Sequence, residues 1–378
     1  MKIWIFIPVM IFMFQFAQAQ IDQPVPGDRA GSYEKPSDPI HTITGINFFI
    51  ENDFLHFLAT NSDDNYTGGI HTRISTNLPV FNISVPFIPK DMLWQQFHNL
   101  GGGVITYTPE DLERSEIILD DRPYSSYQFF SYSVKSVSKD INTMIDLEIS
   151  VGSMGKNIGG DMQVKIHDEE WFGSTRPVPE GWHNQIANGG AFAFNLHGTH
   201  RRYLMEWYRG EINLMDNLYS ATNPFKPLYV ASALDINVGN VVTNASAGLQ
   251  FGLLNYNNFF GFSNSADLTA IAENRESLPW YKKLSFSLTV KPRIRYVLHN
   301  AHLTGRFLKT ESVHVVNTED LNRVFFEYDV RAMAGFTVLE TFLINISYGL
   351  SGRGKEFTFQ NKDFHHWGNL YLSINYRH

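Results

Sequence analysis

Several segments of the chain alternate between apolar and polar residues for longer than strands of soluble proteins usually do. In the clearest one, residues 284–298, the even positions are apolar or proline, and the odd positions include Lys291, Arg293 and Arg295. Because successive side chains of a strand point to opposite faces, such a segment has one apolar face and one polar face. Charged residues on the polar face suit a water-filled lumen better than a dry core, so the pattern predicts a transmembrane β-barrel.

The same alternation recurs along the chain, and we count about 10–13 such segments. Aromatic residues gather near segment ends, as in Trp280-Tyr281 and Trp207-Tyr208, where the aromatic girdles of a membrane barrel lie. We therefore predict one all-β domain over residues 44–378, a closed antiparallel barrel. A soluble sandwich or a lipocalin-like barrel also alternates, and it is the alternative fold.

The N-terminus reads as a targeting segment. Lys2 precedes an apolar run over 3–16, and Ala17-Gln18-Ala19 forms a small-x-small cleavage site. The run is shorter than the roughly 20 residues of a spanning helix, so we predict a cleaved signal peptide over 1–19. An uncleaved anchor is the alternative. Residues 20–43, rich in Pro, Gly and Asp, are then a periplasmic lead-in to a barrel in the outer membrane of a Gram-negative bacterium.

The composition narrows the partners and the source of stability. The chain has no cysteine, so no disulfide scaffold stabilises it. Its formal net charge of −8 argues against nucleic acid as a partner. We expect a monomer surrounded by outer-membrane lipids.

Short polar residues flank the loop of the first predicted hairpin. Glu51-Asn52-Asp53 ends the first strand, and Asp64-Asn65-Tyr66-Thr67-Gly68-Gly69 begins the return. Since single-chain barrels start and end in the periplasm, this loop is expected outside the cell. Strand parity places Asp53 and Thr67 on the lumenal face near the outer rim and Asn52 on the opposite face. A carboxylate, an amide and a hydroxyl at this junction suit a hard cation or a hydrolytic water.

A second polar block lies in a later extracellular loop. It includes residues 160–167, which end in His167, and the stretch Pro179 to Gln185. We predict a short helix over 163–171 that covers the rim, so that His167 approaches Asp53 and Thr67. Trp171 and Trp182 are assigned to the interfacial belt.

These motifs, with several others in the same order, resemble the outer-membrane lipid A 3'-O-deacylase family. The matching pieces are 51–53, 66–69, Asp121-Arg122-Pro123-Tyr124, Gln163 to His167, Pro179-x-Gly181-Trp182-x-x-Gln185, 238–240, 248–252 and His366-Trp367-Gly368. The resemblance implies a twelve-stranded barrel, a calcium requirement, and hydrolysis of an acyl ester on lipid A. It assigns the functional roles to Asn52, Asp53, Thr67 and His167. The chain departs from the family pattern at Ser125-Ser126, where Ala-Gly is usual, and in the acidic residues 168–170.

The residue chemistry is consistent with that activity. The imidazole of His167 is the type of group that can act as a base near neutral pH, and calcium held by Asp53 would polarise an ester carbonyl. Asn52 and Thr67 would orient the water, the metal ligands or the imidazole. The chain has no Gly-x-Ser-x-Gly elbow, so we expect attack by water rather than by a serine. Basic residues that could contact the phosphates of lipopolysaccharide are Arg73, Arg122, Lys165 and Arg176.

Two other functions stay open at this point. An outer-membrane phospholipase would act on glycerophospholipids and would ordinarily use a serine nucleophile. A porin or an adhesion barrel would have no catalytic site, although a porin typically has more strands.

Overall fold

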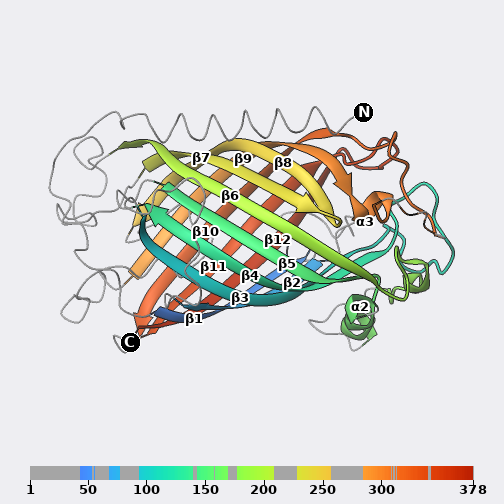
Figure 1. Ribbon diagram of the computed structural model, residues 1–378, viewed down its shortest axis with the longest axis horizontal. Coiled ribbons are helices and arrows are strands. Elements are labelled where there is room, and N and C mark those ends of the chain that lie inside the picture. Colours follow the sequence, from blue (N-terminus) through green and yellow to red (C-terminus); the bar gives the residue numbers. More distant parts are fainter. Residues whose placement is uncertain are drawn as a thin grey trace.

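The protein is a closed barrel of twelve antiparallel strands, each paired with its neighbours in the chain, and the first strand closes on the last (Figure 1). The computed structural model describes residues 43–52, 55, 68–76, 93–138, 143–156, 158–168, 177–207, 228–256, 284–307, 309, 311, 313–338 and 342–377. The barrel and its strand number confirm the predicted fold. The predicted signal peptide and nearly all of the lead-in lie outside the described residues.

The strands are β1 (Ile43–Asn52), β2 (Gly68–Thr76), β3 (Leu93–Tyr107), β4 (Ser125–Ser138), β5 (Thr143–Met154), β6 (Ala191–Trp207), β7 (Leu228–Gly239), β8 (Val242–Tyr256), β9 (Leu284–Asn300), β10 (Val324–Val338), β11 (Phe342–Gly354) and β12 (Phe364–Arg377). The helical elements between them are α2 (Ile158–Asp168), the short η4 (Trp182–Asn184) and α3 (Ala301–Thr304). None of the helices in the described part of the chain is long and apolar enough to cross a membrane.

The two faces of the wall follow the alternation in the sequence. On β9, Ile294 is 60% exposed on the outside, whereas Arg293 and Arg295 line a cavity inside the barrel. On β1, Phe48 and Ile50 are exposed on the outside. The predicted lipid-facing and lumen-facing sets are therefore confirmed in these strands.

The register places the helices at one end of the barrel. Ile43, the first residue of β1, pairs with Arg377 at the C-terminal end of β12, whereas Asn52, the tenth and last residue of β1, pairs with Gly368 near the start of β12. The tip of the first hairpin therefore lies at the end opposite the C-terminus. Helices α2 and α3 lie at that same end (Figure 1), which we call the helical end.

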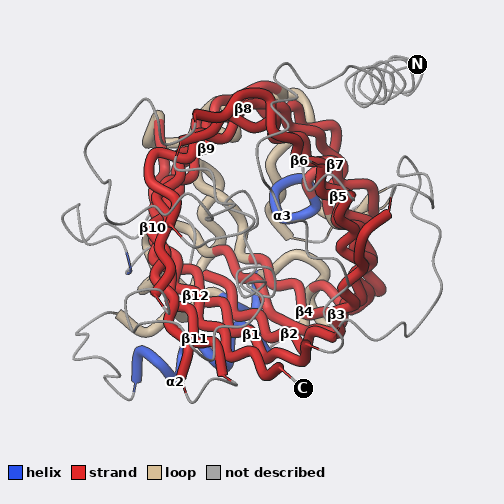
Figure 2. Tube along the Cα trace, turned by 90° about the vertical axis from the view of Figure 1, so that its left-hand side faces the viewer, coloured by secondary structure: helices blue, strands red, loops and turns tan. Residues whose placement is uncertain are grey.

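The mouth at the helical end is filled by the segment that connects β9 to β10. Leu303, Val316, Leu321 and Phe357 form a buried apolar cluster there, and α3 lies inside the ring of strands (Figure 2). The Nδ1 of His302 lies 2.7 Å from the hydroxyl oxygen of Ser125, which joins this segment to β4. We call residues 301–323 the plug.

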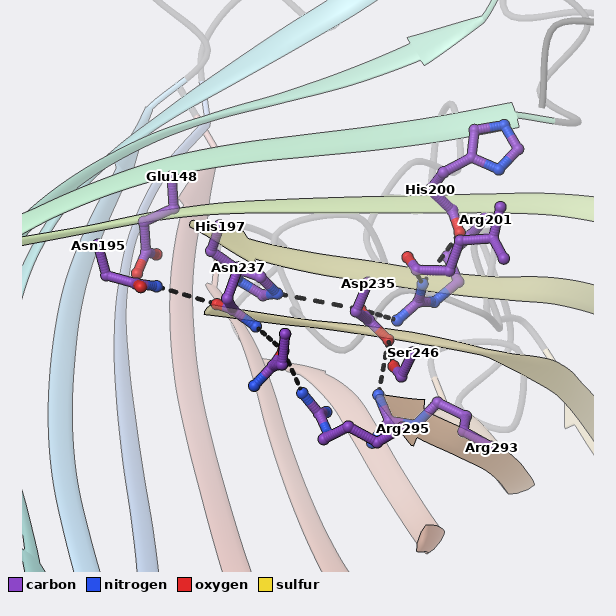
Figure 3. Close-up of polar contacts among 12 residues, drawn as sticks. Glu148, Asn195, His197, His200, Arg201, Asp235, Asn237, Ser246, Arg293 and Arg295 are labelled. Carbon is purple, nitrogen blue, oxygen red and sulfur yellow. Dashed lines mark hydrogen bonds and ion pairs between the residues drawn. The ribbon is translucent and has the colours of Figure 1, made fainter. Parts of the chain in front are cut away.

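Charged side chains fill much of the lumen below the plug, around a cavity of about 460 Å³. Asp235 accepts hydrogen bonds from Arg201 at 2.7 Å and from Arg293 at 2.6 Å (Figure 3). Arg293 also lies 2.8 Å from Glu327, which is paired with Arg295 as well. Mutual pairing of this kind offsets the cost of removing charges from water.

Candidate functional site on the outer wall

Helix α2 packs on the outside of the barrel, against a row of small polar residues at the helical end. Thr106 of β3 shares its parity with Leu100, and Ser126 of β4 shares its parity with Phe130; both Leu100 and Phe130 are exposed on the outer wall. Thr106 pairs with Ser126 on one side and with Gly68 of β2 on the other. The hydroxyl of Thr106 donates to the carbonyl oxygen of Gly68 at 3.1 Å.

The helix can approach this row closely because its first turn carries two glycines. A Cβ on Gly159 would lie 2.4 Å from the methyl carbon of Thr106 and 2.5 Å from the hydroxyl oxygen of Ser126. Such distances do not occur between real atoms, so a side chain at Gly159 would push α2 away from the wall. The glycine pair at 159–160 is a signal in the sequence for this close approach.

A buried tryptophan fixes the other side of α2. The ring of Trp182 lies against Gly160 and Tyr124, and its Nε1 donates to the Oε1 of Gln163 at 2.9 Å. Because Trp182 is only 8% exposed, its assignment to the interfacial belt is wrong. Its indole N–H needs a partner when it is buried, and Gln163 supplies one.

The predicted helix over 163–171 is also corrected in position. It begins at Ile158, ends at Asp168, and contacts β3 and β4 on their outward side rather than covering the rim. In Figure 2, α2 lies at the edge of the ring of strands, whereas α3 lies within it. The mouth that we assigned to this helix is filled by the plug.

His167 lies in the last turn of α2, on the same face as Gly160 and Gln163 by helical spacing. Its Nδ1 lies 2.7 Å from the carbonyl oxygen of Pro177. A carbonyl oxygen can only accept, so Nδ1 carries the proton in the neutral ring. The lone pair is then on Nε2, which is the form that a general base requires.

Asn52 is the second predicted residue that the structure describes at this end. It ends β1 on the parity of the outward-facing Ile50 and Phe48, as predicted. Its amide nitrogen would lie 3.1 Å from a Cβ on Gly68, whose φ of +137° favours glycine.

The remaining catalytic predictions fall on the first loop. Asp53 and Thr67 lie outside the described residues, as do Arg176 and Trp171. Their roles stay predictions. Lys165 lies exposed on α2, within the same element as His167, and its contact with substrate phosphate also stays a prediction.

Arg73 and Arg122 do not lie on the outer wall. Arg73 lines the lumenal cavity and pairs with Glu148. Arg122 is buried, lies 3.6 Å from Glu356, and stacks over the ring of Tyr107 at 4.3 Å. These contacts give both arginines structural roles, so we leave them out of the candidate site.

The acidic neighbour of Arg122 also has a structural role. The carboxylate of Asp121 accepts hydrogen bonds from the backbone N–H groups of Glu110 and Arg122, both at 2.7 Å. Burial nevertheless raises its pKa above the ordinary value. Asp121 therefore shapes the loop before β4.

The first hairpin has donors that fit calcium. Across the described ranges, no three His, Asp or Glu side chains gather as they would around a metal ion. The polar groups nearest to Gly68 are instead the side-chain amide nitrogen of Asn52, 3.1 Å from the position of a Cβ on Gly68, and the carbonyl oxygen of Glu51, 2.4 Å from it. Carbonyl and amide oxygens are the types of ligand that calcium takes, and this hairpin carries both.

Comparison with known proteins identifies the family. The family model described as "Outer membrane protein LpxR" matches residues 5–376. The solved structure of LpxR from Salmonella typhimurium is 17% identical, covers 88% of this chain and 100% of its own, and superposes with a TM-score of 0.60. The β domain of the Bordetella autotransporter BrkA is 8% identical, covers 89% of this chain and 98% of its own, and has a TM-score of 0.40. A search of curated proteins finds no match.

The first of these structures has the same fold, and the family match spans nearly the whole chain. The resemblance inferred from the sequence motifs is thereby confirmed: the chain belongs to the LpxR family of outer membrane proteins.

Proposed function

We propose that this protein removes an ester-linked acyl chain from lipid A by 3'-O-deacylation in the outer leaflet of the outer membrane. Family membership supports the reaction class. The position of α2 supports the substrate, because α2 packs on the outer wall, which lipids can reach without leaving the bilayer. Barrels of this type have both termini in the periplasm, so the helical end faces the cell exterior, where lipid A resides.

His167 acts as the general base in this proposal. Its Nε2 takes a proton from water while the water oxygen attacks the ester carbonyl, and a tetrahedral intermediate forms. Collapse of the intermediate breaks the bond to the sugar oxygen, which takes the proton from Nε2. The products are a fatty acid and a free hydroxyl on the glucosamine. Asn52 and Thr67 orient the attacking water and the imidazole.

Calcium is the cofactor that we propose for this site, with Asp53 as the residue that would hold it. When bound, it would supply positive charge that stabilises the developing oxyanion. The chain itself contributes the tautomer of His167, fixed by the carbonyl of Pro177, and the packing of α2 against the wall.

The observation that carries the proposal is the geometry of His167, with Nδ1 bound to a backbone carbonyl and the residue on the face of α2 that also carries Gly160 and Gln163. The test is mass spectrometry of lipid A from cells that express the wild type or His167→Ala. We expect the variant to lose about 10²–10⁴-fold of the deacylation rate while it still forms a heat-modifiable barrel. His183→Ala, an exposed histidine near the same helix, is the matched control and should keep full activity. Unchanged deacylation by His167→Ala would rule out the base.

The other two functions receive less support from the geometry. The contact between Ser125 and His302 pairs a hydroxyl with an imidazole, but both side chains are buried inside the barrel mouth, away from lipid. A phospholipase would show altered phospholipids with unchanged lipid A in the same mass spectra. The plug and the ion pairs in the lumen give no support to a wide channel.

A further inference from the structure

The cavity in the lumen has more basic than acidic side chains around it. Among the described residues, eight lysines and arginines line the cavity, against six aspartates and glutamates. Strands β6–β10, which follow one another around the barrel, carry five of the basic residues and three of the acidic ones, and the other strands carry three of each. The surplus of two positive charges therefore lies on the β6–β10 side of the lumen.

Most of the arginines on that side already have carboxylate partners that hold them in place. Arg201 and Arg293 both pair with Asp235 (Figure 3), and Arg293 and Arg295 both pair with Glu327. Side chains that are fixed before a ligand arrives lose less conformational freedom when it binds. The ion pairs thus give this side of the cavity a defined distribution of charge.

Lys291 of β9 is a buried cation that lines the same cavity. It is 5% exposed, and it makes no hydrogen bond or ion pair with any residue that the structure describes. Asp329, its register partner on β10, lies instead 3.6 Å from Arg331. Nearby arginines repel the ammonium group and nearby carboxylates attract it. Since a buried charge without a partner is costly, a ligand with negative charge is expected beside Lys291.

Arg331 offers a second cationic group next to Lys291. It lies two residues beyond Asp329 on β10 and on the same face, which makes it a diagonal neighbour of Lys291. Its hydrogen bond to Asn369 at 3.3 Å and its ion pair with Asp329 both use Nη2. Its Nη1 makes no hydrogen bond within the described part of the chain. A guanidinium N–H and an ammonium group are therefore both left for one ligand.

The charge and the size of the cavity indicate a phosphate group. A phosphate monoester carries about two negative charges above pH 7, which matches the surplus on the β6–β10 side, whereas a carboxylate carries one. Lysine binds phosphate as a point charge, and arginine binds it through N–H groups at fixed angles. The volume of about 460 Å³ lies within the range of roughly 300–1,000 Å³ for small-molecule pockets. The cavity thus has room for a phosphate group together with a small organic part.

We propose that the β6–β10 side of the lumen binds a phosphate group, either free phosphate or the phosphate of a small monoester, and that Lys291 and Arg331 contact it. The bound phosphate supplies the negative charge that Lys291 lacks, and it thereby stabilises the barrel. The inference does not rest on the proposed deacylation, because the cavity lies inside the barrel and α2 packs on the outside.

Isothermal titration calorimetry of the full-length protein in detergent micelles tests the site. Inorganic phosphate, glucose 6-phosphate and glucose are titrated at about pH 8, where an ordinary histidine is neutral, and at one ionic strength set with sodium chloride. We expect the wild type to bind at least one of the two phosphate compounds and not to bind glucose. Binding of inorganic phosphate would show that the phosphate group alone suffices, and binding of glucose 6-phosphate alone would identify a monoester as the ligand.

Three variants assign that binding to the lumen. Lys291→Met should weaken it about tenfold or more, because a hydrogen bond to a charged group is lost. Arg331→Lys keeps the charge but not the fork of N–H groups, and it should weaken binding by a smaller factor. Lys309→Met is the matched control, since Lys309 is exposed, and it should leave binding unchanged.

Urea unfolding gives a second readout. Lys291→Met removes a buried charge without a partner, so its unfolding midpoint in phosphate-free buffer should be higher than that of the wild type. A saturating concentration of the phosphate compound that binds should raise the midpoint of the wild type and leave that of Lys291→Met unchanged. If the wild type binds neither phosphate compound, or if Lys291→Met binds as tightly as the wild type, the inference is overturned. If Lys291→Met does not fold, the wild-type titrations and Arg331→Lys decide.

Discussion

The lumen and the outer wall under α2 use polar residues in opposite ways. In the lumen the carboxylates Asp235 and Glu327 each pair with two arginines, at distances between 2.6 and 2.8 Å. On the outer wall the polar residues are few and uncharged, and the polar side-chain atoms of Ser126 and Gln128 are unpaired in the described part of the chain.

The paired charges of the lumen have a structural role. Charges that are mutually paired inside a protein contribute to a specific fold, and removing one partner leaves the other uncompensated. Some buried atoms of the lumen also lack a partner in the described part of the chain, among them the Nε of Arg293 and the Oδ1 of Asp146, so pairing alone does not locate a site. We place the proposed site on the outer wall because His167 lies on α2 there.

Removing one carboxylate tests whether the ion pairs of the lumen are structural. Asp235→Ala leaves Arg201 and Arg293 without their shared partner in a buried place. We expect the free energy of unfolding in detergent to fall by about 3–5 kcal/mol, measured by urea titration. The deacylation rate of the protein that remains folded should not change. A large loss of rate per folded molecule would place the lumen in the catalytic machinery.

A surface pair provides the control for that prediction. Asp111 lies 3.8 Å from Arg114, and both side chains are more than half exposed. Asp111→Ala should therefore change the unfolding free energy by about 0–1 kcal/mol. If Asp235→Ala is as mild as this variant, the lumenal pairs do not contribute to stability in the way that we infer.

Removal of calcium tests the proposed site on the outer wall. Chelation of calcium should lower deacylation by about 10²–10³-fold, the usual effect of losing one oxyanion-stabilising group. Added calcium should restore the rate and raise the free energy of unfolding by about 2.7 kcal/mol at a hundred times the dissociation constant. Asp53→Ala should abolish both responses. Full activity in the chelated protein would remove calcium from the proposal.

The sequence was sufficient to predict which face of a strand points into the lumen. The alternation over 284–298 correctly placed Arg293 and Arg295 inside and Ile294 outside, because the period of a strand is two and tolerates no intermediate orientation. The alternation was poor between residues 214 and 280, where the structure has β7 and β8. Small buried residues such as Ala231 and Ala245 stand there in place of large apolar ones, and they weaken the contrast between faces.

The packing of loops was not predictable in the same way. Alternation fixes the face of a strand residue but contains no information on which side of the wall a loop helix packs. The helix was expected over the mouth, whereas Gly159 and Trp182 hold it on the outer wall, and the mouth is filled by the plug, which no motif indicated. Polar residues at outward positions of β4 were a readable signal, since Ser126 and Gln128 break the apolar parity.

The packing of α2 offers a smaller test of where the site lies. Gly159→Leu would place a side chain into Thr106 and Ser126 and displace the helix from the wall. We expect the barrel to remain folded, because β3 and β4 keep their ladder, and kcat/KM to fall about tenfold or more, since misplacing a catalytic group weakens its alignment. Asp161→Ala, at an exposed position of the same helix, should be neutral. Equal activity of the two variants would show that the seating of α2 is not required.

The smallest expected effect is a loss of plug stability as the pH falls. Burial, with a further contribution from Arg122, lowers the pKa of His302 to about 3, whereas an unfolded histidine has a pKa of about 6.5. The unfolded chain therefore binds more protons than the folded plug between these values. Stability is fully present above pH 6.5 and falls by about 1.4 kcal/mol for each pH unit below it. Burial would raise the pKa of the neighbouring Glu356, but Arg353 and Arg122 hold it below its ordinary value, so it stays ionised between pH 5.5 and 6.5.

Hydrogen exchange of plug amides measures this directly. The N–H of Val316, which donates to the carbonyl of Leu303 at 2.8 Å, should lose about fivefold of its protection, corrected for intrinsic rates, between pH 6.5 and 5.5. His302→Gln keeps a polar partner for Ser125 but cannot take up the proton, so its protection should not depend on pH in this window. If both proteins lose protection equally, another group controls the plug. Protection of the amides of α2 should not change with pH in either protein, because the described contacts of α2 with the wall are made by Thr106, Ser126 and Trp182, which lie outside the plug.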